Sequence, residues 1–413
     1  MKIYIEADGC SRRMNEFASL HKYFELNNHD FVNRPDQADF ILAGTCAFKG
    51  KEEEESIKRI RYLKGMKGKL LVYGCLPDIA PTRYHAEFNG LEFLAPKDID
   101  RIDSYFENNQ LKFRDLQPQN IIPEKMKSTS LQSAIGKFKE EFEFSNKFLV
   151  KAKDYAGKKI RSSLHLHQEV FYLFICRGCL GKCTYCAIKR AIGPLKSTDG
   201  NEIVNQLREG IASGHKKFTI LGDDVGAYGK DRNDTFPNLL GHLLKESNGH
   251  NESVKPHHNG AIGFHIEEIH PKWMTLYQKE MLELVSTRRI RSILCPIQSG
   301  NNRILGLMKR EHDARGISAV LSGIRTLHPG IRLKTQIIVG FPSETESEFK
   351  QTLTQVDRNR FDEVTVFPYD AKENTPANHI GPRVSAQVIS ERVEKALAFF
   401  KTRKISAHLN CQN

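Results

Sequence analysis

The sequence predicts an α/β protein, with an N-terminal parallel-sheet domain followed by a partial or full α/β barrel. Two observations predict this class. Short apolar runs alternate with amphipathic helical stretches over residues 1–105, and the same alternation returns from residue 168 to about residue 380. In addition, cysteines follow the ends of several apolar runs. The carboxyl edge of a parallel sheet is where ligands bind.

The N-terminal domain, residues 1–105, is expected to hold three strands with helices between them. The expected strands read MKIYIEA, ADFILAGTC and GKLLVYGC, and the expected helices read NEFASLHKYFELNN and KEEEESIKRIRYLKGM. Cys10, Cys46 and Cys75 each fall at or just after a strand end. Three strands can therefore bring these cysteines to one place. The alternative is three buried thiols, which are common in protein cores.

The rest of the chain divides into three parts. Residues 106–167 are expected to form a basic linker, whose run from Lys147 to Arg161 is either a solvated face or a contact for nucleic-acid phosphates. Residues 168–380 repeat strand–helix units and are predicted as the barrel. Residues 381–413 are expected to form an amphipathic helix and a tail. The expected barrel strands read EVFYLFIC, KKFTILG, IRLKTQIIVGF and EVTVFPY.

Composition narrows the class of protein. No apolar run approaches the roughly 20 residues of a membrane-spanning helix, and the N-terminus lacks an apolar signal segment, so a cytoplasmic protein without membrane contact is expected. A reducing cytosol disfavours disulfides, so the nine cysteines indicate metal ligation or burial. The net charge of +12 favours a polyanionic partner such as RNA, although a basic protein without such a partner is the alternative.

A dense cysteine cluster stands directly after the first barrel strand. Cys179, Cys183 and Cys186 form a C-x3-C-x2-C pattern, and three such thiolates can bind three corners of a cubane iron–sulfur cluster. The fourth iron would then be open to a substrate or cofactor, as at a catalytic zinc. A zinc site is the rival interpretation, but its two knuckles would be separated by only three residues. With Cys176 as a fourth ligand, a closed electron-transfer cluster is a further alternative.

The C-x3-C-x2-C pattern, with Tyr185 before its last cysteine, resembles the signature of radical S-adenosylmethionine (SAM) enzymes. This resemblance implies a partial (β/α)6 barrel and an open iron that chelates SAM. The upstream segments EADGCSRRMNE, ILAGTCAF and LVYGCLP resemble the three cysteine motifs of the methylthiotransferase family. The resemblance implies that Cys10, Cys46 and Cys75 hold a second [4Fe–4S] cluster. The segment GDDVGAYGKD is most similar to the branch that acts on threonylcarbamoyladenosine in tRNA.

Further blocks of the same family supply candidate contacts to SAM or substrate. Asp223 and Asp224 follow a barrel strand, where a carboxylate could pair with the SAM ammonium. Gln298 and Ser299, in CPIQSGNNR, could hydrogen-bond SAM or substrate. Gly340, in VGFPSET, permits close backbone approach to a cofactor.

Four other positions have weaker or competing interpretations. Tyr185 could pack on adenine or be a core aromatic. Glu344 is expected to begin a helix rather than act in catalysis. Cys176 and Cys295 are extra cysteines, interpreted as inert buried thiols or local sulfur carriers.

The resemblance implies an enzyme, a radical SAM methylthiotransferase that converts C–H to C–S–CH3 with two [4Fe–4S] clusters and SAM. The expected substrate is a tRNA adenosine next to the anticodon, and the expected electron donor is a flavodoxin or ferredoxin. No segment after Ala377 resembles the RNA-binding TRAM domain of tRNA-acting members. A ribosomally made peptide or protein is therefore the alternative substrate, and a non-catalytic iron–sulfur or RNA-binding protein is the alternative class.

Overall fold

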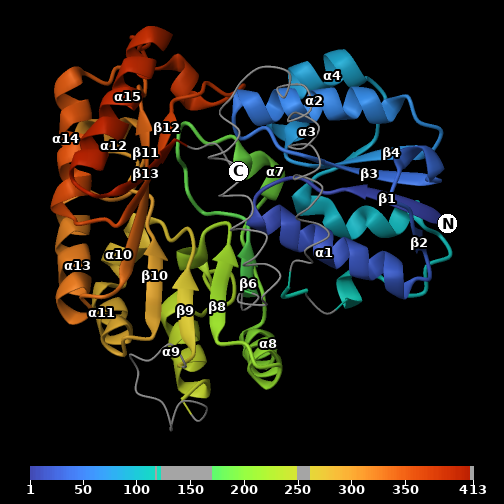
Figure 1. The fold of residues 1–413 in the computed structure, drawn as a ribbon, viewed down its shortest axis with the longest axis horizontal. Coiled ribbons are helices and arrows are strands. Elements are labelled where there is room, and N and C mark those ends of the chain that lie inside the picture. Colours follow the sequence, from blue (N-terminus) through green and yellow to red (C-terminus); the bar gives the residue numbers. More distant parts are fainter. Residues whose placement is uncertain (117–118, 122–169, 249–260, 410–413) are drawn as a thin grey trace, which may run out of the picture.

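The computed structural model describes residues 1–116, 119–121, 170–248 and 261–409. These residues form two parallel sheets that lie side by side, with the N-terminal sheet on the right and the barrel sheet on the left of Figure 1. The predicted class, an α/β protein with a parallel-sheet domain before a barrel, is confirmed. The basic run from Lys147 to Arg161 lies outside the described residues.

The N-terminal sheet has five strands in the order β2-β1-β3-β4-β5, all parallel. The strands are β1 (Lys2–Glu6), β2 (Asp30–Phe31), β3 (Phe40–Thr45), β4 (Lys69–Gly74) and β5 (Phe93–Leu94). The helices are α1 (Ser11–Leu26), α2 (Gly50–Lys64), α3 (Leu76–Ile79), α4 (Pro81–Phe88) and the 3₁₀ segments η1 (Pro35–Gln37), η2 (Pro96–Tyr105) and η3 (Phe113–Asp115). All three predicted strands are present; β2 and β5 are additional two-residue strands.

Alternating side chains place an apolar core on each face of this sheet. In β4, Leu71 and Tyr73 pack toward α1 and η2, whereas Leu70 and Val72 pack toward α2 and α4. This follows from the period of two along a strand. The core that contains Leu70 and Val72 also includes Ala191 of α7 (Ile188–Ile192), a helix of the barrel domain. The two domains therefore share apolar contact as well as polar contact.

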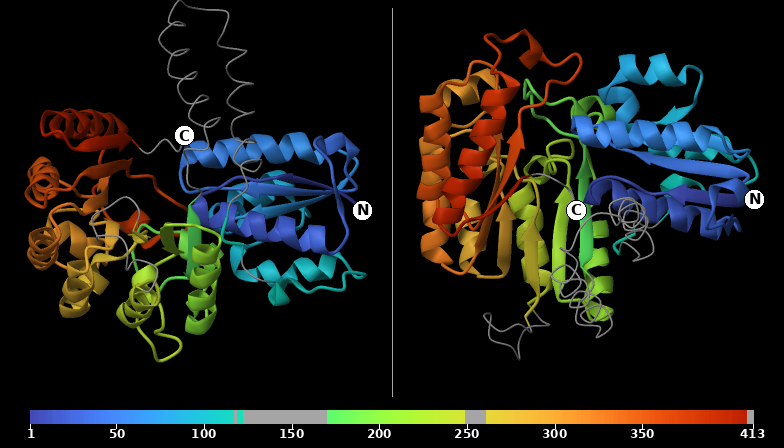
Figure 2. Two further views of the ribbon diagram at one scale, coloured as in Figure 1. Left: turned by 60° about the horizontal axis from the view of Figure 1, so that its bottom comes forward. Right: turned by 45° about the horizontal axis from the view of Figure 1, so that its top comes forward.

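The barrel sheet has eight strands in the order β13-β12-β11-β10-β9-β8-β6-β7, parallel except for β6 with β7. The strands are β6 (Phe171–Arg177), β7 (Lys196–Ser197), β8 (Lys217–Gly222), β9 (Gly263–Ile266), β10 (Ile290–Leu294), β11 (Arg332–Val339), β12 (Glu363–Pro368) and β13 (Ser406–Leu409). The longer helices pack on the outer face of the curved sheet (Figure 2). The longer helices are α8 (Gly200–Ala212), α9 (Phe236–Glu246), α11 (Gln278–Ser286), α13 (Ala314–Leu327), α14 (Glu346–Arg358) and α15 (Ala386–Thr402).

Shorter helices lie in the connections of the barrel. They are α7 (Ile188–Ile192), α10 (Pro271–Leu276), α12 (Asn302–Leu307) and the 3₁₀ segments η4 (Val225–Ala227) and η5 (Pro376–His379). Among the residues that the structure describes, no helix has the length and apolar character needed to cross a bilayer.

The C-terminal segment continues the barrel sheet beyond residue 380. The expectation was a helix and a tail outside the barrel, but Ser406–Leu409 forms β13, which pairs in parallel with β12. The reason is that α15 buries Val393, Ala396 and Phe400 against the sheet. This packing returns the chain to the sheet edge, as in other strand–helix–strand units.

Candidate active site

A cavity of about 410 Å³ lies between the two domains, lined by residues that follow the carboxyl ends of both sheets. All six cysteines predicted as ligands line it. We call Cys10, Cys46 and Cys75 the N-terminal triad, and Cys179, Cys183 and Cys186 the barrel triad. Cys176 and Cys295 are buried and do not line the cavity. The six cysteines that the sequence motifs predicted as ligands therefore face the cavity, and the two extra cysteines, Cys176 and Cys295, do not.

Local backbone contacts hold the N-terminal triad in place. Cys10 directly precedes α1, and Cys75 directly precedes α3. The Ser56 hydroxyl, on α2, accepts a hydrogen bond from the Cys46 amide and donates one to the Cys46 carbonyl, both at 2.9 Å. Burial raises the pKa of Cys75 to about 12, against the opposing effect of Arg13. Burial raises the pKa of Cys46 as well.

The barrel triad lies in the loop between β6 and α7. The Cys179 sulfur accepts a hydrogen bond from the Gly181 amide at 3.2 Å. The Arg310 guanidinium donates to the Cys183 sulfur at 3.5 Å. Burial raises the pKa of Cys179 to about 12 and also raises that of Cys186. Buried thiols of this kind exchange their proton for a bound metal, which couples metal binding to proton release.

Each triad has three thiols, a number that fits a cubane with one open iron. Among the described residues, no group of three His, Cys, Asp or Glu side chains is placed to hold one metal ion. Tetrahedral zinc with Zn–S bonds of about 2.3 Å would need sulfurs roughly 3.8 Å apart. A cubane instead takes each thiolate on a different iron. A Cβ on Gly181 would lie 3.2 Å from the Cys179 sulfur and 3.7 Å from the Cys183 sulfur, so the glycine leaves this space open.

Asp223 and Asp224 both line the cavity, but they have different partners. Asp223 accepts a hydrogen bond from the Gly178 amide at 2.8 Å and forms ion pairs with Arg12 at 3.2 Å and Arg13 at 3.7 Å. It therefore joins the barrel to α1. Asp224 accepts from the Trp273 indole at 2.8 Å. Burial raises the pKa of Asp224.

Gln298 faces the cavity, whereas Ser299 and Gly340 do not. The Gln298 side-chain oxygen is buried without a hydrogen-bond partner, which fits a site for a polar ligand group. The Ser299 hydroxyl lies 3.2 Å from the Thr352 hydroxyl of α14, and its contact with SAM or substrate stays a prediction. Gly340 has a φ of +78°, and a Cβ there would lie 2.3 Å from Cγ1 of Ile389, so the glycine makes room for α15, while its approach to a cofactor stays a prediction.

Tyr185 packs in an apolar core, as one of its two interpretations predicted, and its contact with adenine stays a prediction. It lines the cavity and also packs in the apolar cluster around Phe341, with ring centroids 6.5 Å apart. Glu344 does not cap α14, because its carboxylate accepts from the Gly340 amide at 2.8 Å and from Arg392 at 3.0 Å. The cap is Thr345 instead.

Three arginines that line the cavity were not among the predicted site residues. Arg12 and Arg13 line the cavity on the N-terminal side, and Arg310 lines it on the barrel side. The signal for the first two was the Arg-Arg pair two residues after Cys10. A cluster ligated by thiolates is anionic, so buried guanidinium groups beside both triads would stabilise it.

A parallel barrel sheet with a C-x3-C-x2-C loop after its first strand defines the chain as a radical SAM protein. Comparison with known families agrees, since the Radical SAM superfamily matches residues 173–356 and the uncharacterized protein family UPF0004 matches residues 2–95. The chain thus holds the two matched domains, and its sequence is similar to those of tRNA methylthiotransferases.

Two relatives illustrate the extent of the similarity. The threonylcarbamoyladenosine tRNA methylthiotransferase of Drosophila melanogaster is 27% identical over 404 residues, which cover 97% of this chain and 65% of that protein. The probable threonylcarbamoyladenosine tRNA methylthiotransferase of Pyrococcus horikoshii is 25% identical over 382 residues, covering 91% of this chain and 79% of that protein. This chain therefore spans slightly less than two thirds of the insect relative.

Solved structures share the fold. The radical SAM methyltransferase TsrM from Kitasatospora setae aligns with a TM-score of 0.54 at 11% identity, covering 88% of this chain and 72% of that chain. The cobalamin-dependent radical SAM enzyme OxsB aligns with a TM-score of 0.53 at 13% identity, covering 97% of this chain and 56% of that chain. Similarity at this identity concerns the fold alone.

Proposed function

We propose that this protein is a radical SAM methylthiotransferase that modifies an adenosine of tRNA next to the anticodon. The observation that carries the proposal is the convergence of two cysteine triads on one cavity. Its relatives are named for the same chemistry, as threonylcarbamoyladenosine tRNA methylthiotransferases and as a tRNA-2-methylthio-N(6)-dimethylallyladenosine synthase. The net charge of +12 suits a polyanionic substrate.

The chain's own residues would divide the work between the two sides of the cavity. The N-terminal triad would hold one [4Fe–4S] cluster, and the barrel triad would hold the other and leave an iron open to SAM. When bound, the clusters and SAM would supply the electron, the radical that takes the substrate hydrogen, the sulfur and the methyl group, so that C–H is replaced by C–S–CH3. The unpartnered Gln298 oxygen would accept a hydrogen bond from SAM or substrate. Cys75 is buried, and the other five cysteines of the two triads are half-buried.

Asp223 takes a different role in this proposal from its predicted one. Its carboxylate is already paired with Arg12 and Arg13, so it would orient those guanidinium groups toward the N-terminal triad. Asp224 stands closer to the barrel triad, with its carboxylate 3.9 Å from the Cys179 sulfur. It is therefore the better candidate to pair with the SAM ammonium. A cytoplasmic flavodoxin or ferredoxin would deliver the electron.

Two measurements test the proposed function. Anaerobically reconstituted protein should hold about eight irons per chain, and a variant with alanine at Cys10, Cys46 and Cys75 should hold about four. Nucleoside mass spectrometry should show a methylthio-adenosine derivative in tRNA that disappears when the gene is deleted. Its return with the wild-type gene but not with the triple variant would support the proposal. An unchanged nucleoside profile after deletion would refute the tRNA assignment.

A further inference from the structure

A loop of the barrel supplies hydrogen bonds that two helices of the N-terminal domain lack. Helix α2 begins after Lys49 and α4 begins after Ala80, and neither of these residues caps its helix with a side chain. The first helical amides are unpaired within a helix and need an acceptor. Lys and Ala are poor residues for that purpose.

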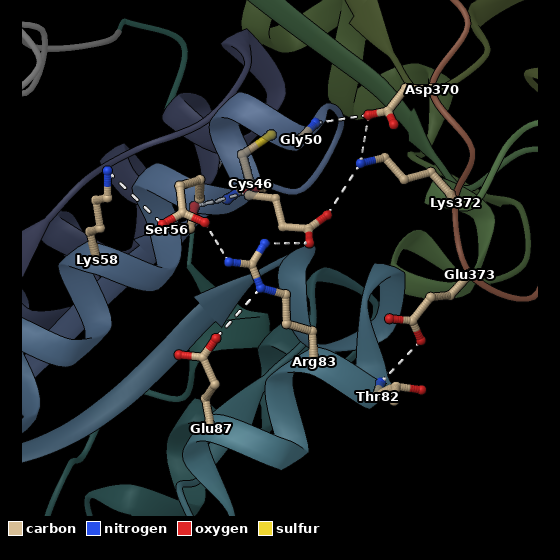
Figure 3. A network of polar contacts seen from close by, with 12 residues as sticks. Cys46, Gly50, Ser56, Lys58, Thr82, Arg83, Glu87, Asp370, Lys372 and Glu373 are labelled. Carbon is tan, nitrogen blue, oxygen red and sulfur yellow. Dashed lines mark hydrogen bonds and ion pairs between the residues drawn. The ribbon is translucent and has the colours of Figure 1, made fainter. Parts of the chain in front are cut away.

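The missing caps come from the loop that follows β12. The Asp370 carboxylate accepts a hydrogen bond from the Gly50 amide at 2.8 Å, and the Glu373 carboxylate accepts one from the Thr82 amide at 3.1 Å. Figure 3 shows both carboxylates reaching from the barrel loop to the starts of the two helices. Each carboxylate also lies at the positive end of a helix dipole, and this favourable electrostatic interaction strengthens the contact between the loop and the helix.

A buried lysine adds a third link across the same interface. Lys372 is 7% exposed, and its ammonium lies 3.3 Å from Glu53 of α2 and 2.9 Å from Asp370. Glu53 also pairs with Arg83 of α4 at 3.1 Å. The lysine therefore joins the capping loop to α2, and through Glu53 to α4 (Figure 3).

Arg190 forms the fourth link, from the helix that follows the barrel triad. Its guanidinium donates to the carbonyls of Asp78 at 2.8 Å and Ile79 at 2.9 Å, in the helix that follows Cys75. It also donates to the carbonyls of Glu373 at 2.8 Å and Asn374 at 3.3 Å, in the capping loop. One side chain thus connects both domains and the loop between them.

These four residues, Asp370, Lys372, Glu373 and Arg190, form what we call the interdomain clamp. The segments that the clamp joins lie close in sequence to the cysteines of both triads. Helix α2 begins four residues after Cys46, and its Ser56 holds the Cys46 backbone. Arg190 stands four residues after Cys186 and grips α3, which begins directly after Cys75.

We propose that the interdomain clamp is a positioning device that fixes the spacing of the two cysteine triads across the cavity. Apolar contact at Ala191 and the ion pairs of Asp223 with Arg12 and Arg13 also join the domains, so loss of the clamp would loosen the N-terminal domain against the barrel rather than release it. Its consequence for turnover rests on the proposed function, because transfer of a methylthio group to a substrate held between the triads requires a reacting geometry that a shift of about 1 Å can slow by about 10²-fold.

The test begins with spacing, because spacing can be measured without turnover. Tyr62 on α2 and Leu276 on α10 are 63% and 61% exposed, and they lie on different domains. Noncanonical residues at both positions would carry spin labels without using any of the nine cysteines. We expect one narrow distance distribution in the wild-type holoprotein. In the variant Asp370→Ala/Glu373→Ala, the distribution should become about twofold broader, because both helix caps across the interface are removed.

A matched control variant distinguishes the effect of losing the clamp from the effect of losing any two surface ion pairs. Asp36 pairs with Arg34 at 2.6 Å inside the N-terminal domain, and Asp357 pairs with Arg403 at 2.9 Å inside the barrel. The variant Asp36→Ala/Asp357→Ala also removes two carboxylates but crosses no interface. It should keep the wild-type distance distribution. Broadening of similar size in this control, or none in the clamp variant, would overturn the proposal.

The second measurement is the amount of methylthio product formed per SAM cleaved. It uses Glu373→Ala alone, because Glu373 does not line the cavity. We expect the ratio to fall about tenfold or more, with iron content unchanged. A ratio equal to that of the wild type would show that the clamp only joins the domains, and would overturn the positioning role. If the wild-type protein forms no methylthio product, the proposed function fails, and the distance distributions alone decide whether the clamp fixes the spacing.

Discussion

The substitution Gly340→Ala tests why a glycine stands at the end of β11. Its φ of +78° lies in the left-handed region, which alanine adopts at a cost of about 1–2 kcal/mol. The added Cβ would lie 2.3 Å from Cγ1 and 3.0 Å from Cδ1 of Ile389 on α15. Overpacking of this kind costs about 1–3 kcal/mol. The two contributions together predict a loss of about 3 kcal/mol in the free energy of unfolding of the barrel.

A double-mutant cycle separates the two contributions. Ile389→Ala removes the atoms that the new Cβ would meet, so Gly340→Ala in that background should cost only the backbone part, about 1–2 kcal/mol. Urea denaturation of all four proteins, followed by circular dichroism, gives the coupling energy. We expect the substitutions to couple favourably by about 1–3 kcal/mol.

The same variant distinguishes packing from cofactor contact. Gly340 does not line the cavity, so Gly340→Ala should leave SAM affinity unchanged in protein that remains folded. A stability loss below about 0.5 kcal/mol, the range of ordinary surface substitutions, together with weaker SAM binding, would refute the reasoning. It would also restore the role at the cofactor that the sequence pattern suggested.

Two further predictions concern the cysteines and the start of α14. Cys75→Ala should lower the iron content from about eight to about four per chain, whereas Cys295→Ala, which alters a buried thiol outside the cavity, should leave it unchanged in anaerobic iron analysis. Glu348→Gln should destabilise the protein by about 1–3 kcal/mol at pH 7, because Glu348 completes a capping box and pairs with Arg303 at 2.6 Å. The hydrogen bond from Arg303 lowers the pKa of Glu348 from 4.5 to about 2. The wild-type advantage is therefore full above pH 4.5 and should disappear as pH falls through about 2, which denaturation at several pH values would show.

Much of the fold and the identity of the cavity cysteines could be predicted from sequence. The apolar runs of β1, β3 and β4 are long enough to be recognised alone, and each is followed by a cysteine. Because the carboxyl ends of parallel strands share one edge, position along the chain translated directly into position in space. The same reasoning placed Asp223, Asp224 and Gln298 on the cavity.

The remaining features depend on contacts between segments far apart in the sequence. Gly340 is a glycine because of Ile389, and Ser299 is turned toward Thr352. A motif shows that such residues are special but not which neighbour requires them. Strand β13 was not foreseen because four residues, Ser406–Leu409, carry little pattern of their own and pair only after α15 has packed. The clamp residue Asp370 likewise acts on an amide 320 positions away.

The cavity walls come from opposite ends of the polypeptide, since both Cys10 and Lys372 line the same space. During synthesis at about 5–20 residues per second, these two positions leave the ribosome tens of seconds apart. The cysteines of the N-terminal triad therefore lie in an incomplete cavity, open to solvent, until the last barrel strands have been synthesised. If the clusters of the proposed function are inserted only into the complete cavity, their insertion follows translation, and in an aerobic cell the exposed thiols would need protection from oxidants until then.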